Sequence, residues 1–196
     1  IHLIEEDERK SITKLEKLFI DIGLPVEKVK EKVRIGDPIT FAVDLEEFGD
    51  GMIVSRGLDD KMGAWIAARV LEEVKAAGCG HGDLIAAGTV QEEIGLRGGT
   101  TSAYSVDPDI GIAIEVCHAT DYPDIDKRQH GEQVAGKGPV IARGPNINPV
   151  LFDQLVAAAE NAGVDYQVQA EPRGTGTDAN AIQLSRGGKV AGLVSI

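Results

Sequence analysis

Short apolar runs alternate with amphipathic segments through most of this sequence from residue 51 onward. The run Met52–Val54 predicts a strand, and the segment after Asp59 predicts a helix that ends at Gly78. The apolar residues of that segment recur at intervals of four, at Met62, Ile66, Val70 and Val74. Such a stripe is typical of a helix that packs one face against a core.

Two continuous apolar runs predict strands that are covered on both faces. They are Leu84–Val90, which is apolar apart from Thr89, and Ile110–Ile114. A run without polar alternation has no face for solvent, so both are expected inside a largely parallel sheet. Carboxylates follow each run directly.

Two more helices are expected in the rest of the chain. Asn148 and Pro149 supply a cap and a first-turn proline for a helix that ends at Gly163, and Thr177 caps a helix that runs to Arg186. The strands that accompany them are Tyr166–Ala170 and Val190–Val194. This alternation predicts an α/β fold, with three αβα layers around a mostly parallel sheet.

The first 50 residues have a different texture, and we expect two domains, residues 1–50 and residues 51–196. The earlier part mixes charges with the β-like runs Leu18–Ile22 and Pro38–Val43. The Lys/Glu-rich stretch Glu27–Val33 between them suits one short helix. This part is expected to be a small, incomplete β-rich unit.

Charge narrows the range of partners. The chain carries 20 Lys and Arg against 32 Asp and Glu, a formal net charge of −12 that is spread along its 196 residues. Such a balance opposes binding to nucleic acid or to an anionic membrane, and small molecules or peptides become the expected partners. No apolar stretch approaches the roughly 20 residues of a membrane span. We expect a cytoplasmic protein in which Cys79 and Cys117 are reduced and incidental.

Three acidic motifs follow predicted strands and are candidates for chemistry. They are Gly57–Asp60, Gln91–Glu93 and Glu115. In an open α/β sheet, groups at the carboxyl ends of strands meet even when they are distant in sequence. Converging carboxylates repel one another unless a cation neutralises them, so a metal site is the economical interpretation.

Each motif alone also has an ordinary structural interpretation. Asp59 and Asp60 favour a helix N-terminus through its dipole. The Glu92–Glu93 pair suits a solvated loop, and Glu115 suits a surface position. Only the three together indicate a site.

The histidines are weak ligand candidates from their positions. His118 follows Glu115 closely enough to approach the same edge, His2 and His130 fall in predicted loops, and His81 precedes a strand at its far end. A cluster of carboxylates alone suits Mg²⁺ or Mn²⁺, whereas zinc or cobalt would also favour imidazole. The sequence pattern leaves that choice open.

At these same residues the sequence resembles the tetrahedral aminopeptidases, also known as deblocking or glutamyl aminopeptidases, of metallopeptidase family 42. The resemblance covers essentially the whole chain. It lies in the segments Lys17–Gly23, Val33–Pro38, Ser55–Gly63, Val90–Gly98, Lys137–Pro149 and Gly174–Asn180. Several long motifs in the right order make a strong signal.

The resemblance implies a catalytic α/β domain with two zinc or cobalt ions, manganese being possible, and an inserted small β-barrel domain, to the later part of which residues 1–50 correspond. It implies that Asp59 bridges the metals, Glu93 binds one and Glu115 binds the other. Glu92 would be the general base. The family usually has Asp where Glu115 stands, so this ligand reaches one methylene further.

The family's two histidine ligands are expected outside this chain, before residue 1 and after residue 196. The polypeptide by itself is therefore expected to be inactive, and the complete protein to be an enzyme that acts on peptides. The resemblance also implies a homo-oligomer, from dimers to a dodecamer.

Asp178, Arg97 and His118 are further candidates for the substrate pocket, although a surface salt bridge is the more ordinary role for Arg97. Asp178 stands at a predicted helix start, where it would contact a substrate amine or support the ligands, although a first-turn acid is common there. Two other functions stay open. One is a glycosidase that uses a carboxylate pair and no metal. The other is a non-catalytic scaffold with the same fold.

Overall fold

The computed structural model describes residues 10–80 and 82–196, which divide into two units at residues 42 and 43. Among residues 11–42, the regular elements are the 3-10 turn η2 (Leu15–Lys17) and helix α1 (Val26–Lys32). The expected helix is confirmed there, but the expected strands Leu18–Ile22 and Pro38–Val43 are not formed. A strand needs a backbone partner, and no described segment of this unit pairs with either run.

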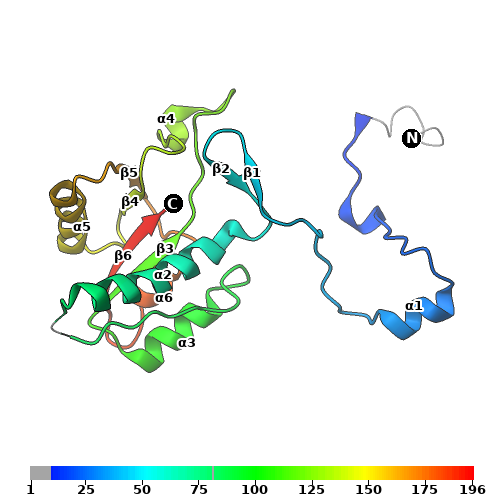
Figure 1. Cartoon of the computed structure of the whole chain (residues 1–196), viewed down its shortest axis with the longest axis horizontal. Helices are drawn as coiled ribbons and strands as arrows, with labels where there is room; N and C mark the ends of the chain where they lie inside the picture. The colour runs from blue at the N-terminus through cyan, green and yellow to red at the C-terminus, as the bar shows by residue number, and fades with distance from the viewer. Residues whose placement is uncertain (1–9, 81) are drawn as a thin grey trace. The chain divides into compact units, whose positions relative to one another are not determined.

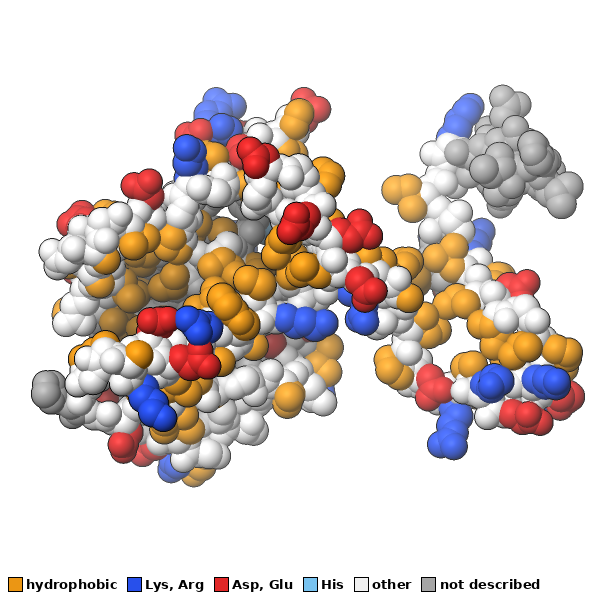
Figure 2. All heavy atoms as spheres, in the orientation of Figure 1, with side chains coloured by type: hydrophobic (Ala, Val, Ile, Leu, Met, Phe, Trp, Pro, Cys, Tyr) orange, Lys and Arg blue, Asp and Glu red, His pale blue; other side chains and the backbone are white. Residues whose placement is uncertain are grey.

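No described side chain between residues 10 and 42 is buried. Phe19 is 94% exposed and Phe41 is 85% exposed. Figure 2 shows hydrophobic side chains lying open over this unit. Whether the unit is part of a β-barrel domain stays a prediction.

The second unit, residues 43–196, holds a four-stranded sheet in the order β3-β6-β4-β5 (Figure 1). Its strands are β3 (Ile110–Glu115), β4 (Val140–Arg143), β5 (Gln167–Ala170) and β6 (Val190–Ser195). The β3–β6 and β4–β5 pairs are parallel, and the β4–β6 pair is antiparallel. The α/β class and the mostly parallel sheet are therefore confirmed.

Helices cover both faces of this sheet. Helices α2 (Leu58–Ala77), α5 (Pro149–Ala162) and α6 (Asp178–Gln183) contact its strands, and α3 (Arg97–Val106) packs against α6. The short helix α4 (Lys127–His130) lies in the connection between β3 and β4. A short antiparallel hairpin, β1 (Glu46–Phe48) with β2 (Met52–Val54), precedes α2. No helix among the described residues is long and apolar enough to cross a membrane.

Two glycines define the layers. A Cβ on Gly111 would lie 2.7 Å from the Ile182 side chain of α6, and one on Gly192 would lie 2.8 Å from the Leu151 side chain of α5. Gly111 pairs with Ala191, the neighbour of Gly192, so the two glycines face opposite sides of the sheet. Helices α5 and α6 therefore cover opposite faces, each approaching closely where the strand has no side chain.

The hydrophobic core lies between the sheet and these helices. It consists of Ala113, Ile141, Ala142, Ile147, Phe152, Ala179 and Leu193. Helix α5 begins where its sequence predicts, because the Asn148 side chain accepts hydrogen bonds from the Val150 and Leu151 N–H groups at 3.0 Å. It ends at Gly163, whose left-handed φ of 65° suits glycine.

Three expectations for this unit are corrected. Leu84–Val90 forms no strand, because no described segment pairs with its backbone. Helix α6 ends at Gln183 instead of Arg186, and the Thr177 side chain makes no capping bond. Strand β4 and helix α3 were not expected.

Candidate metal centre

The first turn of α2 brings two aspartates to the end of β3. Asp59 and Asp60 follow Gly57, whose φ of 68° is left-handed, and their own backbone is not yet helical. The Gly63 N–H donates to Asp60 Oδ1 at 2.7 Å. A Cβ on Gly63 would collide with the Asp60 carboxylate and with the Ile114 carbonyl of β3. Glycine at this position therefore lets the turn approach the strand closely.

A sharp turn carries the two adjacent glutamates. The Gly95 and Leu96 N–H groups donate to the Glu92 carbonyl at 3.1 and 2.9 Å. Gln91 and Leu96, on either side, have left-handed φ values of 58° and 55°. The chain therefore bends sharply near Gly95. Because the chain is not extended here, Glu92 and Glu93 are not forced to opposite sides as strand neighbours would be.

Asp178, the first residue of α6, faces the same region. The Thr89 hydroxyl donates to Asp178 Oδ2 at 2.7 Å. Asp178 Oδ1 is buried and has no hydrogen-bond partner among the described residues. A Cβ on Gly99 of α3 would collide with this carboxylate, so Asp178 is pressed against the start of α3. Its sequence position at a helix start gives no sign of the Thr89 contact.

These side chains influence one another electrostatically. We use the term acidic cluster for Asp59, Asp60, Glu92, Glu93, Glu115 and Asp178. Burial, and then the charge of Asp60, raise the pKa of Glu115 to about 7. Burial and the charge of Asp178 raise the pKa of Glu92, with smaller effects from Glu93 and Asp59. Burial also raises the pKa of Asp60, against hydrogen bonds from Gly63 and Glu115.

The acidic cluster has the chemistry of a cation site but not a closed coordination shell. Carboxylates that raise one another's pKa would be relieved by a divalent cation, and oxygen ligands suit such ions. Within residues 10–80 and 82–196, no group of three or more His, Cys, Asp and Glu side chains is arranged to hold a metal. The described residues thus gather carboxylates in one region without forming a complete metal site.

The candidate residues separate into two groups. Asp59, Glu92, Glu93, Glu115 and Asp178 are brought into mutual influence, as their common position at strand and helix ends predicts. Sequence reasoning named Asp60 only as part of its dipeptide and did not place it beside Glu115. The assignment of individual metal-binding roles stays a prediction.

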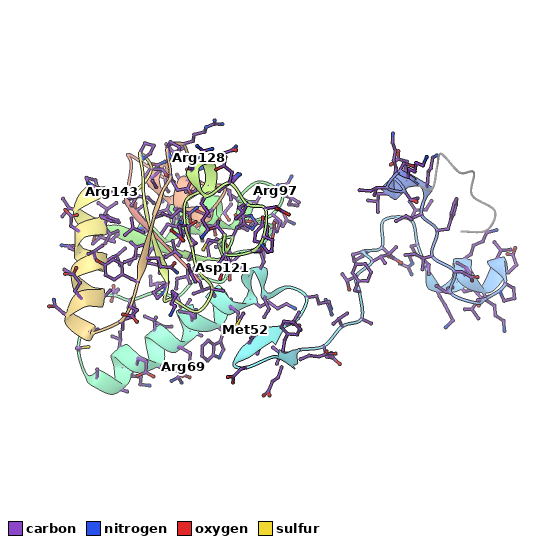
Figure 3. The ribbon with its side chains drawn as sticks, turned by 90° about the horizontal axis from the view of Figure 1, so that it is seen from above. Met52, Arg69, Arg97, Asp121, Arg128 and Arg143 are labelled. Carbon is purple, nitrogen blue, oxygen red and sulfur yellow. The ribbon has the colours of Figure 1, made fainter. Side chains whose placement is uncertain are left out.

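The other candidates lie apart from these contacts. Arg97 is exposed at the start of α3 and its Nη1 donates to Gln91 Oε1 at 3.3 Å, without an ion pair among the described residues (Figure 3). His118 is exposed beyond β3, and His130 ends α4. His2 and His81 lie outside the described residues.

Comparison with known proteins agrees with this architecture. The M42 glutamyl aminopeptidase family model matches residues 1–196. The chain is 33% identical over 183 residues to a lysyl aminopeptidase of Pyrococcus furiosus, covering 91% of this chain and 51% of that protein. It is 30% identical over 200 residues to the putative aminopeptidase FrvX of Escherichia coli, covering 96% of this chain and 53% of that protein.

Solved structures show the same fold. A TET aminopeptidase from the marine sediment archaeon Thaumarchaeota archaeon SCGC AB-539-E09 matches all of this chain and 56% of its own, with a TM-score of 0.88 and 32% identity. An aminopeptidase of Desulfurococcus kamchatkensis matches 99% of this chain and 55% of its own, with a TM-score of 0.82 and 34% identity. The chain spans about half the length of these relatives. It belongs to the M42 glutamyl aminopeptidase family.

Proposed function

We propose that the complete protein is a metal-dependent aminopeptidase that removes N-terminal residues from peptides. The observation that carries this proposal is the acidic cluster, in which partly buried carboxylates raise one another's pKa. A fold has no need of such repulsion, whereas a cation-assisted hydrolase uses it. Membership of a family whose relatives are named aminopeptidases supports the same activity.

Asp59, Glu93 and Glu115 are the residues we expect to hold two divalent ions, zinc or cobalt, with manganese as an alternative. When bound, such ions lower the pKa of a water molecule and stabilise negative charge on a carbonyl oxygen. The Glu115 carboxyl, with its pKa near 7, would lose its proton more readily beside a cation. Asp60 accepts the Gly63 N–H, and its charge raises the pKa of the neighbouring Glu115.

Glu92 is the proposed general base. Its raised pKa brings proton uptake closer to neutral pH, which suits a group that takes a proton from water and returns it to the leaving amine. Asp178, fixed by Thr89, is proposed to bind the ammonium group of the substrate's N-terminus or to support the ligands. Arg97 and His118 are proposed to line the pocket around the peptide.

The decisive experiment assays the full-length protein against a panel of aminoacyl chromogenic amides. Activity should disappear with chelator, return with zinc, cobalt or manganese, and fall at least about 100-fold in kcat for Glu92→Gln. The matched control is Glu160→Gln, an exposed residue of α5. Full activity in the presence of chelator would favour a metal-free hydrolase. A folded, metal-loaded protein without activity would favour a non-catalytic scaffold.

The 196-residue chain alone is proposed to be inactive in the same assay, since its described residues hold no complete group of metal ligands.

The complete protein is proposed to form homo-oligomers, as a dodecameric relative and a tetrahedral peptidase of Pyrococcus horikoshii do. Mass photometry of the complete protein tests whether it forms such oligomers. A single monomer peak at micromolar concentration would contradict it.

A further inference from the structure

A groove of about 630 Å³ lies away from the acidic cluster, between residues 128–133 and the end of β5. Strands β4 and β5 run opposite to β3 and β6. Their carboxyl ends, at Arg143 and Ala170, therefore lie toward the opposite edge of the sheet from Glu115. None of the acidic cluster lines this groove.

One wall of the groove is an unpaired strand edge. The Gln167 and Glu171 N–H groups donate inward, to the Pro139 and Arg143 carbonyls at 2.8 Å. Because backbone groups alternate along a strand, those of Val168 and Ala170 point outward. Both residues are exposed and both line the groove. Among the described residues, no backbone hydrogen bond reaches this outer edge.

Two arginines, Arg128 and Arg143, and two glutamates, Glu132 and Glu171, line the groove, and Arg128 is paired with Asp126 at 3.7 Å. Glu132 is paired with Lys127 Nζ at 2.7 Å, and Glu171 accepts a hydrogen bond from Gln169 at 2.7 Å. Arg143 forms no ion pair within the described part of the chain (Figure 3). Its guanidinium lies over the Phe152 ring, 5.3 Å from the centroid, which restrains its position and leaves its N–H groups available.

The register connects these two features. Arg143 stands directly opposite Ala170 in the β4–β5 pair, so both side chains are on the same face. The small Ala170 side chain leaves that face open toward the groove. A glutamate on a strand added beyond β5 would therefore meet Arg143 across Ala170.

We propose that this groove binds an extended peptide segment that adds to β5 as a further strand and places a glutamate side chain against Arg143. The main chain of β5 supplies affinity for extended backbone, and Arg143 selects the carboxylate. Arg128 also lines the groove, but its charge is paired with Asp126, so Arg143 is the arginine that we expect to meet the carboxylate. This site is separate from the proposed active centre and does not rest on the proposed function.

Fluorescence anisotropy on the full-length protein tests the site with labelled, N-acetylated, C-amidated peptides. The first is Thr-Val-Glu-Val-Thr and the second has Gln in place of Glu, so neither offers a free amine to an aminopeptidase. We expect the Glu peptide to bind about tenfold more tightly than the Gln peptide at low ionic strength. Arg143→Gln should abolish that difference, whereas Arg69→Gln, on the exposed face of α2, should leave it unchanged.

The contribution of main-chain hydrogen bonds to peptide binding is tested by one change in the protein and one change in the peptide. Ala170→Pro removes one outward N–H and should weaken both peptides, since proline is tolerated at a strand edge. N-methylation of the peptide backbone makes the matching change without touching the protein's fold. Equal affinity for the Glu and Gln peptides, no effect of N-methylation, or no binding would overturn the proposal. A Gln peptide with a free C-terminus that binds as tightly as the Glu peptide would overturn the side-chain assignment.

Discussion

Gly98 lies in α3 at a place where the main chain of Val90 leaves no room for a side chain. A Cβ there would collide with the Val90 N and O atoms, which cannot rotate away as a flexible side chain would. We expect Gly98→Ala to lower the free energy of unfolding by about 1–3 kcal/mol, measured by urea denaturation. Gly187→Ala meets no atom within 4 Å and should cause little change. Equal midpoints for the two variants would contradict this packing.

Asn148 offers a second test at the scale of one residue. Its side chain accepts two N–H groups at the start of α5. Replacing it with alanine should cost about 0.5–2 kcal/mol of stability, because those groups lose their acceptor. Asn161→Ala, near the other end of the same helix and exposed, is the control. A loss of the same size in Asn161→Ala would show that capping is not the cause.

Specific side-chain contacts could be predicted from residue types and spacing only where local rules apply. The caps at Asn148 and Gly163 follow from backbone chemistry and were confirmed. The contact between Thr89 and Asp178 joins residues 89 positions apart, and no local pattern indicates it. The same holds for Asp60 beside Glu115, since the adjacent Asp59 satisfies the same sequence pattern.

At the scale of elements, Arg186 and Lys189, in the segment before β6, bind to residues at the end of α3. The Arg186 guanidinium lies 3.5 Å from the Tyr104 ring centroid and its Nε donates to the Tyr104 carbonyl at 2.9 Å. Lys189 Nζ lies 2.6 Å from Asp107 Oδ1. The hydrogen bond from Lys189 lowers the pKa of Asp107, so folding is favoured when Asp107 is ionised.

This ion pair predicts a pH dependence with a definite sign. A carboxyl whose pKa is lowered on folding stabilises the protein above its ordinary pKa, and that stabilisation is lost as pH falls through the folded value. Lys189→Met should therefore lower Tm at about pH 6, and the difference from wild type should narrow at about pH 2.5. Thermal unfolding followed by circular dichroism checks it. A difference that stays constant with pH would point to packing instead.

Helices and strands could be predicted where an apolar pattern extends over many residues. They were harder to predict where a strand depends on a backbone partner from another part of the chain. The stripe that ends at Gly78 corresponds to α2, and Ile110–Ile114 to β3. Leu84–Val90 has an equally apolar composition but lacks a partner for its backbone. Strand β4 was not predicted because it is only four residues long, and so short an apolar run shows no periodicity. It lies within the Lys137–Pro149 motif.

For the whole molecule, the two units should differ in their contribution to stability. Residues 10–42 bury no side chain, so they add no hydrophobic packing. A chain shortened to residues 43–196 should unfold within about 2 °C of the 196-residue chain. Differential scanning calorimetry measures both. A fall of more than about 5 °C would show that the first unit stabilises the second.

Fold class at this scale was predictable, because alternating strands and helices leave few layer arrangements. The antiparallel placement of β4 against β6 was not, since strand direction depends on connections whose course the hydrophobic pattern does not specify. The groove beside β5 could not be predicted either, because its position depends on the same strand directions.

The strand order has a consequence for biosynthesis. Strand β6 is the last in the described chain, yet it lies between β3 and β4. While the ribosome is still translating residues 116–189, β3 has no β6 to pair with and the β4–β5 pair has no connection to it. The sheet can therefore close only after β6 has left the exit tunnel. Until then the nascent chain exposes unpaired strand edges, which are the sites where incomplete chains tend to aggregate.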